Sequence, residues 1–540
     1  MIEEPFKKPP PQGDFEPPPQ PKRYWWRFLL ASFLIVFVTA GAVSASGLIY
    51  IESIANELAH NNVLKNKVDR FLQKTSGGEA QNILILGSDK RAGDEEEAGR
   101  SDTTMLLRLD PDNNAIALMS IPRDLKVEIP GVGTEKFSSA YAYGGPKLTL
   151  QVVKELTGLP INHVVNVDFL GFVRAVYAIG CVYVDIDRRY YHSNVGVPPS
   201  EQYSEINVQP GYQLMCGKRA LEYVRYRHTD TDIVRAARQQ DFLSAARQRV
   251  PIADLVLGRN DLIEIFTEYT TSDISDKEAM LEVLKLFVAS RNAEINEVDF
   301  PAELGPSFVY ANSTAIAEAV DRFQGIEASG GPRGSLEEAE SNKKKGKKKA
   351  KGKKKKKKKP KPKLKTKPPG SDGLVPALEA GEEEAKIVAR KVSRGFPVFY
   401  PSRLPSGAAY EESNPLLHIQ DPRVYHFKDT DGNRHGAYRM VLELDLPDGT
   451  HYFGVQGVQG WSDPPILDAP SVKQTIRGRE YEIFLDGDRV RLVAWHRGDN
   501  TYWIANSLLR VLTSDQMIGI ARSARVKIPN KKPRKRRAAN

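Results

Sequence analysis

The stretch that decides the fold of this chain is QNILILGSDK, residues 81–90. Four consecutive apolar residues, Ile83 to Leu86, precede Gly87, a pattern typical of a strand that is buried on both faces. Two more short apolar runs follow, at Met105–Leu109 and Ile116–Ile121, and they predict two further strands. The core of a folded domain is therefore expected to begin with this stretch.

Helical and strand-like patterns alternate after these three strands. The helical segments are Lys147–Thr157, Phe169–Ile179, Gly217–Tyr226, Ile233–Val250, Leu255–Glu268 and Lys277–Ser290, and the strands among them are Val164–Val167 and Val182–Ile186. Such alternation predicts an α/β domain with layers of helices and strands. We expect this domain to span residues 81–325.

A second, smaller domain is expected near the C-terminus. Alternating apolar and polar residues predict antiparallel strands at Tyr438–Leu444, His451–Val458, Glu480–Leu485, Val490–Trp495 and Thr501–Ala505. Asp486-Gly487 and Gly498-Asp499 are hairpin-type turns, and Thr513 with Gln516 resembles a capping box that opens a last helix. These patterns predict a small α+β domain over residues 385–528, for which the sequence indicates no catalytic pattern.

The segment between the two domains carries most of the chain's positive charge. Residues 326–384 are low in complexity and are expected to be disordered. The net charge is +10, but eighteen lysines lie between Lys343 and Lys367, so the rest of the chain sums to −8. The basic tail, residues 529–540, holds six more positive charges, so the chain without the lysine run and the tail has a net charge of −14. The folded parts therefore offer no general field for polyanions, and no nucleic-acid partner is predicted.

One membrane helix is predicted near the N-terminus. Residues 28–51 contain no charged side chain, and a helix of that length covers the ~30 Å hydrocarbon core of a bilayer. Aromatic and basic residues precede it, which places residues 1–27, a Pro-rich tail, in the cytoplasm and the rest outside the cell. A cleaved signal peptide is the alternative, although its apolar region would be shorter, at ~7–15 residues. Residues 52–80 are expected to form a helical stalk.

The two cysteines, Cys181 and Cys216, both lie in the predicted α/β domain. An oxidising exterior favours a disulfide between them, and two unpaired buried thiols are the alternative. Neither has the spacing of a metal ligand or an adjacent base.

Charged residues lie at one end of each of the first three strands. Asp89 follows the first strand, Arg100 and Asp102 lie at the start of the second, and Arg123 and Asp124 end the third. Ligands of open α/β sheets gather beside strand ends, and two carboxylates with phosphate oxygens can hold Mg²⁺. Turn formation is the alternative role for any single aspartate in such a loop.

A second cluster of cations lies at residues 223–240. On a helix, Asp232, Arg235 and Gln239 fall on one face, with Arg238 adjoining them. Guanidinium groups bind phosphate oxygens in pairs and stay charged, so this face is suited to a pyrophosphate. A solvated helix face with salt bridges is the alternative.

Together these segments resemble the LytR-CpsA-Psr family of membrane-anchored phosphotransferases, over about residues 81–250. The resemblance rests on six ordered motifs: residues 82–89, 100–103, 120–124, 135–145, 220–227 and 235–240. It implies that Mg²⁺ is held by Asp89 and Asp102, and that the phosphate end is lined by Arg91, Arg100, Arg123, Arg225, Arg227, Arg235, Arg238 and Gln239. It also implies an apolar cavity for the prenyl tail. Cys181 stands where family members often carry a second glycine, which is consistent with the bridge to Cys216.

The resemblance implies an enzyme that joins a polyprenyl-pyrophosphate-linked glycopolymer to peptidoglycan by a phosphodiester bond and releases polyprenyl phosphate. The residues expected to carry the transfer are Asp102, Arg123, Asp124 and Arg227, with Asp102 or Asp124 as candidates to assist the proton. A non-catalytic lipid-pyrophosphate binding or scaffold protein is a second hypothesis. A membrane-bound transcription regulator is a third, but the predicted topology places the domain across the bilayer from the chromosome.

Overall fold

A computed structural model of the chain describes residues 63–75, 78–88, 101–113, 115–198, 202, 204–226, 230–249, 270–274, 282–283, 286, 294–325, 372–412, 422–468, 470–486 and 489–529. The chain divides into two compact units, Met1–Glu52 and Ser53–Asn540, and all of these residues lie in the second. The predicted membrane helix, cytoplasmic tail, lysine run and basic residues 531–537 lie outside them. No helix among the described residues is long and apolar enough to span a bilayer.

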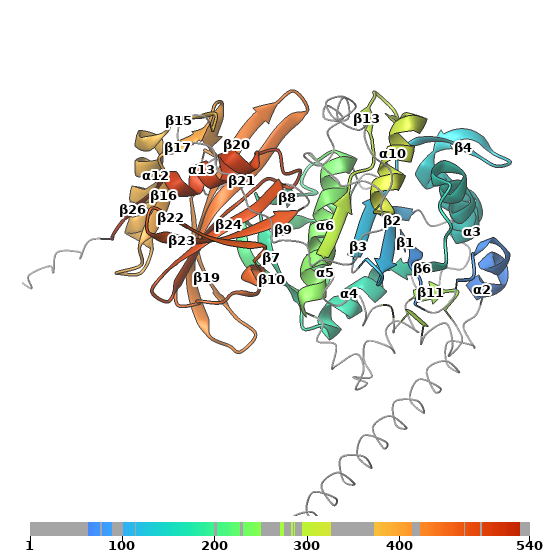
Figure 1. Cartoon of the computed structure of the whole chain (residues 1–540), viewed down its shortest axis with the longest axis horizontal. Coiled ribbons are helices and arrows are strands. Elements are labelled where there is room, and N and C mark those ends of the chain that lie inside the picture. Colours follow the sequence, from blue (N-terminus) through green and yellow to red (C-terminus); the bar gives the residue numbers. More distant parts are fainter. Residues whose placement is uncertain are drawn as a thin grey trace, which may run out of the picture. The chain divides into compact units, whose positions relative to one another are not determined.

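A mixed six-stranded sheet forms the centre of the first domain (Figure 1). Its strand order is β11-β6-β1-β2-β3-β12. β1 runs antiparallel to β2, which runs antiparallel to β3, whereas β6 and β12 lie parallel to β1 and β3. The bounds are β1 Gln81–Ser88, β2 Ser101–Asp110, β3 Ala115–Ser120, β6 His163–Asp168, β11 Thr270–Ser272 and β12 Glu294–Val298. The three strands predicted first are therefore neighbours in one sheet.

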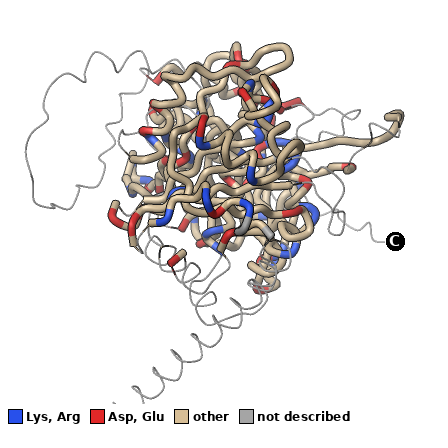
Figure 2. Tube along the Cα trace, turned by 90° about the vertical axis from the view of Figure 1, so that its right-hand side faces the viewer, with Lys and Arg blue, Asp and Glu red and all other residues tan. Residues whose placement is uncertain are grey.

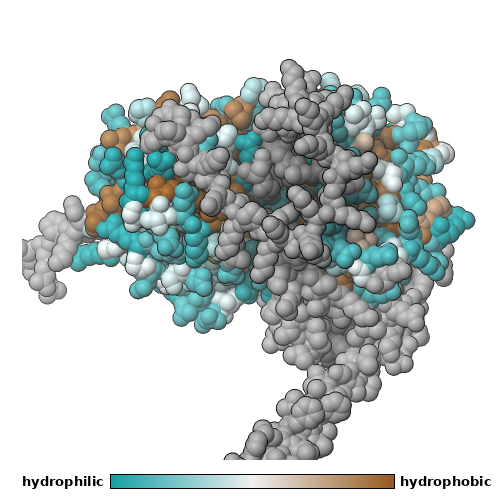
Figure 3. Space-filling view, in the orientation of Figure 1, coloured by the Kyte–Doolittle hydropathy of each residue, from teal (hydrophilic) through white to brown (hydrophobic). Residues whose placement is uncertain are grey.

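The surface of the described chain carries both signs of charge. Blue and red segments alternate along the trace in Figure 2. In Figure 3 the described hydrophobic residues form short patches between hydrophilic ones. This distribution agrees with a basic character that is confined to the lysine run and the tail.

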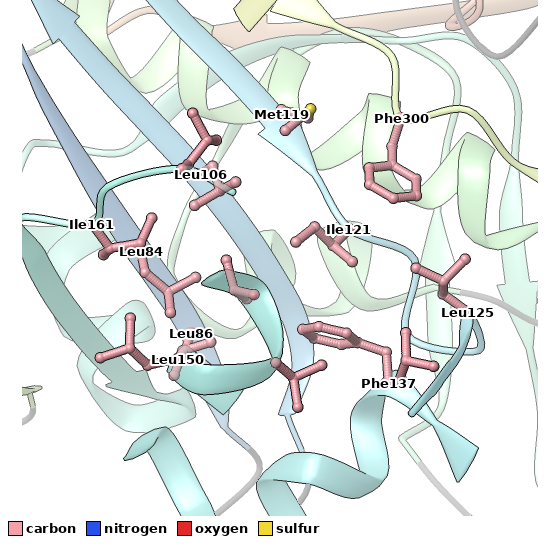
Figure 4. Close-up of a cluster of buried hydrophobic side chains, with 14 of the residues drawn as sticks. Leu84, Leu86, Leu106, Met119, Ile121, Leu125, Phe137, Leu150, Ile161 and Phe300 are labelled. Carbon is pink, nitrogen blue, oxygen red and sulfur yellow. The ribbon is translucent and has the colours of Figure 1, made fainter. Parts of the chain in front are cut away.

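The sheet is buried on both faces, as the continuous apolar run in β1 predicts. Leu84 and Leu86 point into the main core with Leu106 of β2, and Ile83 joins a second cluster on the opposite face. Figure 4 shows Leu84, Leu86, Leu106, Leu150 and Phe137 converging in the main core. Gly87 allows a close approach of β1 and β2, because a Cβ atom there would lie 3.1 Å from Cβ of Thr103.

The described helices of the first domain follow the predicted pattern with one extension. The predicted helices Leu255–Glu268 and Lys277–Ser290 lie wholly or largely outside the described residues. The bounds are α2 Val63–Val68, α3 Phe137–Thr157, α4 Phe169–Ala178, α5 Gly217–Arg225, α6 Asp232–Arg249 and α10 Ser313–Phe323, with a 3-10 turn, η1, at Asp69–Phe71. α3 begins ten residues before the predicted Lys147 because its two halves join at a kink at Gly145, followed by Pro146. Pro fits the first turn of the second half, where its missing N–H is not needed.

The segment expected as a stalk packs into the domain. Leu64 and Val68 are buried in the main core. The chain after them is held by Asn162, whose side-chain amide donates to the carbonyl of Gln73 at 2.9 Å. The stalk boundary at residue 80 was therefore wrong for residues 63–75, because their apolar face finds a partner in the α/β domain.

Short paired strands complete the first domain. They are β4 Lys126–Ile129 with β5 Gly133–Lys136, β7 Val182–Ile186 with β10 Gly211–Met215, β8 Tyr190–His192 with β9 Ile206–Val208, and β13 Glu303–Leu304 with β14 Val309–Tyr310. A disulfide joins Cys181, just before β7, to Cys216, just after β10, with Cα atoms 4.7 Å apart. Gly217 follows with φ +45°, and a Cβ atom there would lie 2.1 Å from the ring of Tyr177. The predicted pairing is the one that the structure contains.

The C-terminal domain is an antiparallel sheet covered by two helices. β18, β20, β21, β25, β24, β23 and β22 lie side by side in that order, and β19 pairs with β20. The bounds are β15 Leu374–Pro376, β16 Val398–Pro401, β17 Arg403–Pro405, β18 Ala408–Tyr410, β19 Arg423–Lys428, β20 Arg434–Leu446, β21 Gly449–Val458, β22 Val472–Ile476, β23 Arg479–Asp486, β24 Arg489–Arg497, β25 Asn500–Ala505, β26 Ala524–Lys527, α12 Leu378–Lys391, α13 Ser514–Ser523 and a 3-10 turn, η3, at Pro465–Leu467. The five predicted strands are β20, β21, β23, β24 and β25. Thr513 and Gln516 form the predicted capping box of α13.

This domain begins earlier than the sequence predicted. Residues 372–384 were expected in the linker, but they form β15 and the first half of α12. Ala385 and Val388 of α12 are fully buried in the core of this domain, whereas Glu379 and Glu383 are exposed. The apolar face of α12 is narrow and lies among glutamates, so the composition of this segment did not predict a helix.

We expect Cys181→Ser to lower the free energy of unfolding by ~2–4 kcal/mol, because the disulfide closes a loop of 35 residues and restricts the unfolded chain. Chemical denaturation measures this change, and the parent protein treated with reductant serves as the control. Equal stability of variant and parent would contradict a structural role for the bridge.

Candidate functional site

The strand ends that carry the predicted motifs meet at one edge of the central sheet. Gly87 of β1 pairs with Thr103 of β2, and Ser120 at the end of β3 pairs with Met105 two residues further along β2. On the other side of β1, Ser88 pairs with the last residue of β6. Segments 82–89, 100–103 and 120–124 therefore lead to the same place in the fold.

Asp102 occupies an irregular position in this edge. The register of β1 and β2 shifts, so that Gly87 pairs with Thr103 and Ser88 with Ser101, and Asp102 has no partner across the ladder. Such bulges redirect a side chain and are frequent next to active sites. Asp102 thus lies opposite the end of β1. Asp89 is the next residue of the chain after β1.

Helix α6 is tied to this edge by two glutamines. The side-chain amide of Gln239 donates to the hydroxyl of Thr103 at 2.9 Å and to the carbonyl of Val224 at 3.1 Å. The amide of Gln240 donates to the hydroxyl of Ser120 at 3.3 Å. Figure 1 shows α6 beside β3. The second cluster of predicted residues is thereby joined to the first.

Arg225 reaches the same edge from the end of α5. Its guanidinium lies over the ring of Phe169, 3.7 Å from the ring centre. Phe169 begins α4, directly after Asp168, which pairs with Ser88 and caps α4 by accepting from the amide of Gly171 at 2.7 Å. Burial raises the pKa of Asp168. Arg225 is therefore stacked at the ends of β1 and β6.

Arg123 and Asp124 follow β3 at this edge. The Asp124 carboxylate lies 3.1 Å from Nζ of Lys136 and 3.5 Å from Nε of Arg123. The Arg123 side chain is 16% exposed and that of Asp124 is 30% exposed. Lys136 precedes α3, so the fourth predicted motif, residues 135–145, also starts beside this pair. Asp124 is thus a partner of two cations.

The structure corrects the expected role of Arg238. Its side chain is 0% exposed, and one amino group donates to the carbonyls of Tyr223 and Tyr226, both at 2.8 Å. The other amino group forms an ion pair with Asp230. Arg238 holds α5, α6 and the segment between them together, because its hydrogen bonds point into the protein. It is a structural cation rather than a phosphate ligand.

A second arginine completes this buried network. Arg188 also pairs with Asp230, and its guanidinium lies 4.7 Å from the ring centre of Tyr190. Burial would lower the pKa of Arg188, but the neighbouring carboxylates, that of Asp230 first, outweigh it and raise the pKa. The hydroxyl of Tyr190 donates to Asp187 at 2.6 Å. Sequence reasoning missed this network, because nothing in the residues around Asp230 distinguishes a buried carboxylate from an exposed one.

The remaining predicted residues are described in part or not at all. Arg235 of α6 is 5% exposed. Its backbone amide donates to the carbonyl of Thr231 at 3.1 Å. The structure describes the backbone of Asp102 but not its side chain. Asp89, Arg91, Arg100 and Arg227 lie outside the described residues. Among the residues that the structure describes, no three metal-binding side chains gather.

Two cavities help to locate the site. One of about 20 Å³, between the end of β3 and α6, is lined by Ser120, Pro122, Ile233, Ala236, Ala237, Gln240, Val298, Asp299 and Phe300. It is about large enough for one water molecule. A groove of about 770 Å³ includes Tyr177 and Arg219, at the first turn of α5. We favour the small cavity's surroundings as the site, because Arg225 lies at the other end of α5, about 10 Å from Arg219 at 1.5 Å per residue.

Comparison with known proteins gives matches to the first domain. Residues 46–329 match the model of the LytR_cpsA_psr family. The polyisoprenyl-teichoic acid–peptidoglycan teichoic acid transferase TagT of Bacillus subtilis is 27% identical over 260 residues, or 47% of this chain and 80% of TagT. The transferase of the same description TagU of Oceanobacillus iheyensis is 30% identical over 286 residues, or 50% of this chain and 84% of TagU.

Two further matches are of interest. The probable cell wall biosynthesis protein LcpB of Corynebacterium glutamicum is 36% identical over 177 residues, which are 30% of this chain and 40% of LcpB. A crystal structure of B. subtilis TagT is 24% identical, covers 48% of this chain and 95% of that chain, and has a TM-score of 0.36. The family match ends at residue 329, so the C-terminal domain lies beyond it.

We expect Arg238→Ala to lower the free energy of unfolding by ~3–5 kcal/mol, because it leaves the buried Asp230 carboxylate with one cation fewer. Thermal or chemical denaturation measures the change, and Arg174→Ala, at an exposed position of α4, is the matched control. If Arg238→Ala were as stable as this control, Arg238 would not be a structural cation.

Proposed function

Because the chain belongs to the LytR-CpsA-Psr family, we propose that it joins a polyprenyl-pyrophosphate-linked glycopolymer to peptidoglycan through a phosphodiester bond and releases polyprenyl phosphate. Relatives of this chain are named as transferases of teichoic acid from a polyisoprenyl carrier to peptidoglycan.

The observation that carries the proposal is the hydrogen bond from Gln239 to Thr103. It joins the cationic face of α6 to the sheet edge where β1, β2 and β3 present their motifs. Arg123 and Arg225 come to this edge from two other elements. Cations that converge from separate elements are the expected means of binding a pyrophosphate, because each phosphate offers several oxygens to planar guanidinium groups.

The reaction that we propose is a displacement at phosphorus. The oxygen of a peptidoglycan hydroxyl forms a bond to the sugar-linked phosphorus, and the bond from that phosphorus to the bridging oxygen breaks. The electron pair stays on the bridging oxygen, which leaves as part of polyprenyl phosphate. The hydroxyl proton passes to a carboxylate or to solvent, and cations at the site stabilise the charge that develops on the transferring group.

Asp102 and Asp124 are the candidates for the proton. Asp124 lies beside Lys136 and Arg123. A charged carboxylate can accept a hydrogen bond from the attacking hydroxyl and orient it. Asp102, at the bulge of β2, is the alternative and also a proposed metal ligand.

The donor set at the sheet edge fits Mg²⁺. The bulge brings Asp102 opposite the end of β1, from which the chain continues directly to Asp89. Mg²⁺ is commonly bound by one or two carboxylates together with phosphate oxygens, and when bound it would neutralise charge on the pyrophosphate. Asp89 and Asp102 are therefore the residues that we propose to hold it.

We further propose that the protein is anchored in the cell membrane by residues 28–51, with its N-terminus in the cytoplasm and its domains outside. The uncharged stretch of twenty-four residues supports this topology, and a lipid-linked substrate requires an enzyme near the bilayer. The prenyl tail needs apolar surroundings, and the main core beside the sheet and α3 is a large apolar cluster. Its side chains would have to separate to admit the tail.

Incubation of the full-length protein with a lipid-pyrophosphate oligosaccharide, Mg²⁺ and peptidoglycan fragments tests this function. Release of lipid monophosphate in step with a new glycan adduct supports transfer. Tight retention of the lipid with no adduct would instead favour a non-catalytic binding or scaffold protein.

We predict that Arg123→Ala lowers kcat/KM for transfer by ~10²–10³-fold, because it removes a cation from the charge that develops at phosphorus. The unfolding midpoint should stay close to that of the parent, since the side chain is partly exposed. Arg174→Ala, which removes the same charge from an exposed site on α4, should transfer at the parent rate. Parent-like turnover of Arg123→Ala would show that the anion site is elsewhere, and Arg227→Ala should behave like Arg123→Ala.

We also predict that chelation of divalent cations stops transfer and that Mg²⁺ restores it. In Asp89→Asn combined with Asp102→Asn, Mg²⁺ should no longer bind with the prenyl pyrophosphate, because both proposed carboxylate ligands are gone. Titration calorimetry measures this binding. Unchanged Mg²⁺ affinity in the double variant would rule out these carboxylates as ligands.

A further inference from the structure

The C-terminal domain packs directly on helix α6, although it lies beyond the family match. Leu508 and Leu509, in the segment after β25, are buried against Ala237 of α6. Ile233 and Val234 of the same helix pack at the edge of this cluster. One face of the helix that carries Arg235 and Gln239 is therefore covered by the C-terminal domain.

An ion pair lies beside this apolar contact. Arg510 follows Leu509, and one of its amino groups lies 2.6 Å from the carboxylate of Asp241 on α6. Its Nε lies 3.1 Å from Asp486 of β23, and its other amino group donates to the carbonyl of Ser507 at 2.8 Å. The side chain is 4% exposed. Arg510 thus connects α6 to the sheet of the C-terminal domain.

The backbone and the charge of Arg510 both indicate a fixed arrangement. Its φ is +54°, a left-handed conformation that is uncommon for residues other than glycine. Burial would lower its pKa, but Asp241 and Asp486 outweigh burial and raise it, so the guanidinium stays charged. Strained backbone conformations persist where the surrounding structure holds the residue in place. Arg510 is held in this way by its ion pairs with Asp241 and Asp486.

The geometry of α6 links this contact to the site. Asp241 lies four residues after Ala237 and therefore on the same face, toward the C-terminal domain. Gln239 lies two residues before Asp241 and so points to another side, where it binds Thr103 at the sheet edge. The helix is held between the two domains. A shift of α6 on one side changes the position of Arg235 and Gln239 on the other.

A second contact joins the C-terminal domain to a segment of the first domain that is linked to α6. Arg439 of β20, which is 0% exposed, lies 3.0 Å from Asp185 of β7, and Nε1 of Trp503 donates to the same carboxylate at 2.9 Å. Arg188, three residues after Asp185, is bonded through Asp230 to Arg238 of α6. The C-terminal domain also packs on Tyr183 of β7 and Tyr212 of β10, so α6 is one of several segments that it contacts.

We propose that the C-terminal domain is a clamp on helix α6, and that Arg510 is a positioning residue that holds Arg235 and Gln239 in place for a prenyl pyrophosphate. This inference rests on the proposed function and assigns the domain a part in it. Arg510 acts through Asp241 and does not touch the substrate.

The clamp is tested in the full-length protein with Arg510→Gln, and Arg497→Gln is the matched control. Arg510→Gln breaks the link to Asp241, whereas Arg497→Gln removes the same charge from an exposed position of β24 and leaves the contacts of Arg510 in place. We measure the affinity for geranylgeranyl pyrophosphate, kcat and KM of transfer, and hydrogen exchange of the amides in residues 232–249. Arg510→Gln should weaken affinity or kcat/KM by about tenfold to hundredfold and speed the exchange, because small displacements of binding groups have large effects. Arg497→Gln should do neither.

Further variants keep the test decisive. If Arg510→Gln does not fold, Asp241→Asn breaks the same contact from the other side. If both single variants fold, combining them should cause no loss beyond Arg510→Gln alone. Arg510→Lys, which keeps the charge, should recover part of the loss, whereas a merely volume-filling role would give no such recovery.

Two results would overturn the clamp. One is parent-like affinity and exchange in Arg510→Gln and Asp241→Asn, and the other is an equal loss in the control Arg497→Gln. If the parent protein neither binds the prenyl pyrophosphate nor transfers glycan, the proposed function is wrong. The amide hydrogen exchange of residues 232–249 then decides by itself whether Arg510 holds α6.

Discussion

The hydrogen bond from Gln239 to Thr103 fixes helix α6 on the edge of the central sheet, and the candidate site depends on it. Each cation at this edge comes from a different element, so no single segment can form a pyrophosphate site. α6 itself is anchored by the buried Arg238, whose hydrogen bonds reach Tyr223 and Tyr226. A buried charge is costly unless it is paired, and the bonds of Arg238 to Tyr223, Tyr226 and Asp230 therefore hold α6 beside α5.

Most of the fold could be predicted from local patterns. The apolar run at Ile83–Leu86 predicted a strand buried on both faces, because only a two-sided core accommodates consecutive apolar residues. The alternation of helices and strands predicted the α/β class, and Thr513 with Gln516 predicted the start of α13. Residues 63–75 and 372–384 were placed in a stalk and a linker, because their apolar faces are narrow and their partners are distant in sequence. Gln73, for example, donates to the carbonyl of Ile161, and Leu374 pairs with Pro405.

The convergence of the candidate residues could be predicted, but their roles only in part. Charged residues beside the end of β1, the start of β2 and the end of β3 indicated one shared edge, and the structure brings these positions together because the strands are neighbours. The sequence could not separate Arg235 from Arg238, since both lie on α6 and carry the same charge. The difference arises from Asp230 and two backbone carbonyls, which reach Arg238 only in the folded chain. The contact of Arg510 with Asp241 joins residues 269 apart in sequence, and no local pattern indicates it.

The central claim is that the ends of β2 and β3 with helix α6 form one site for a lipid pyrophosphate. A crystal structure of the protein with geranylgeranyl pyrophosphate tests it most directly. Our account predicts phosphate oxygens within hydrogen-bond distance of Arg123 and of at least one of Arg225, Arg235 and Gln239. Phosphates bound instead in the groove beside Tyr177 and Arg219 would contradict it.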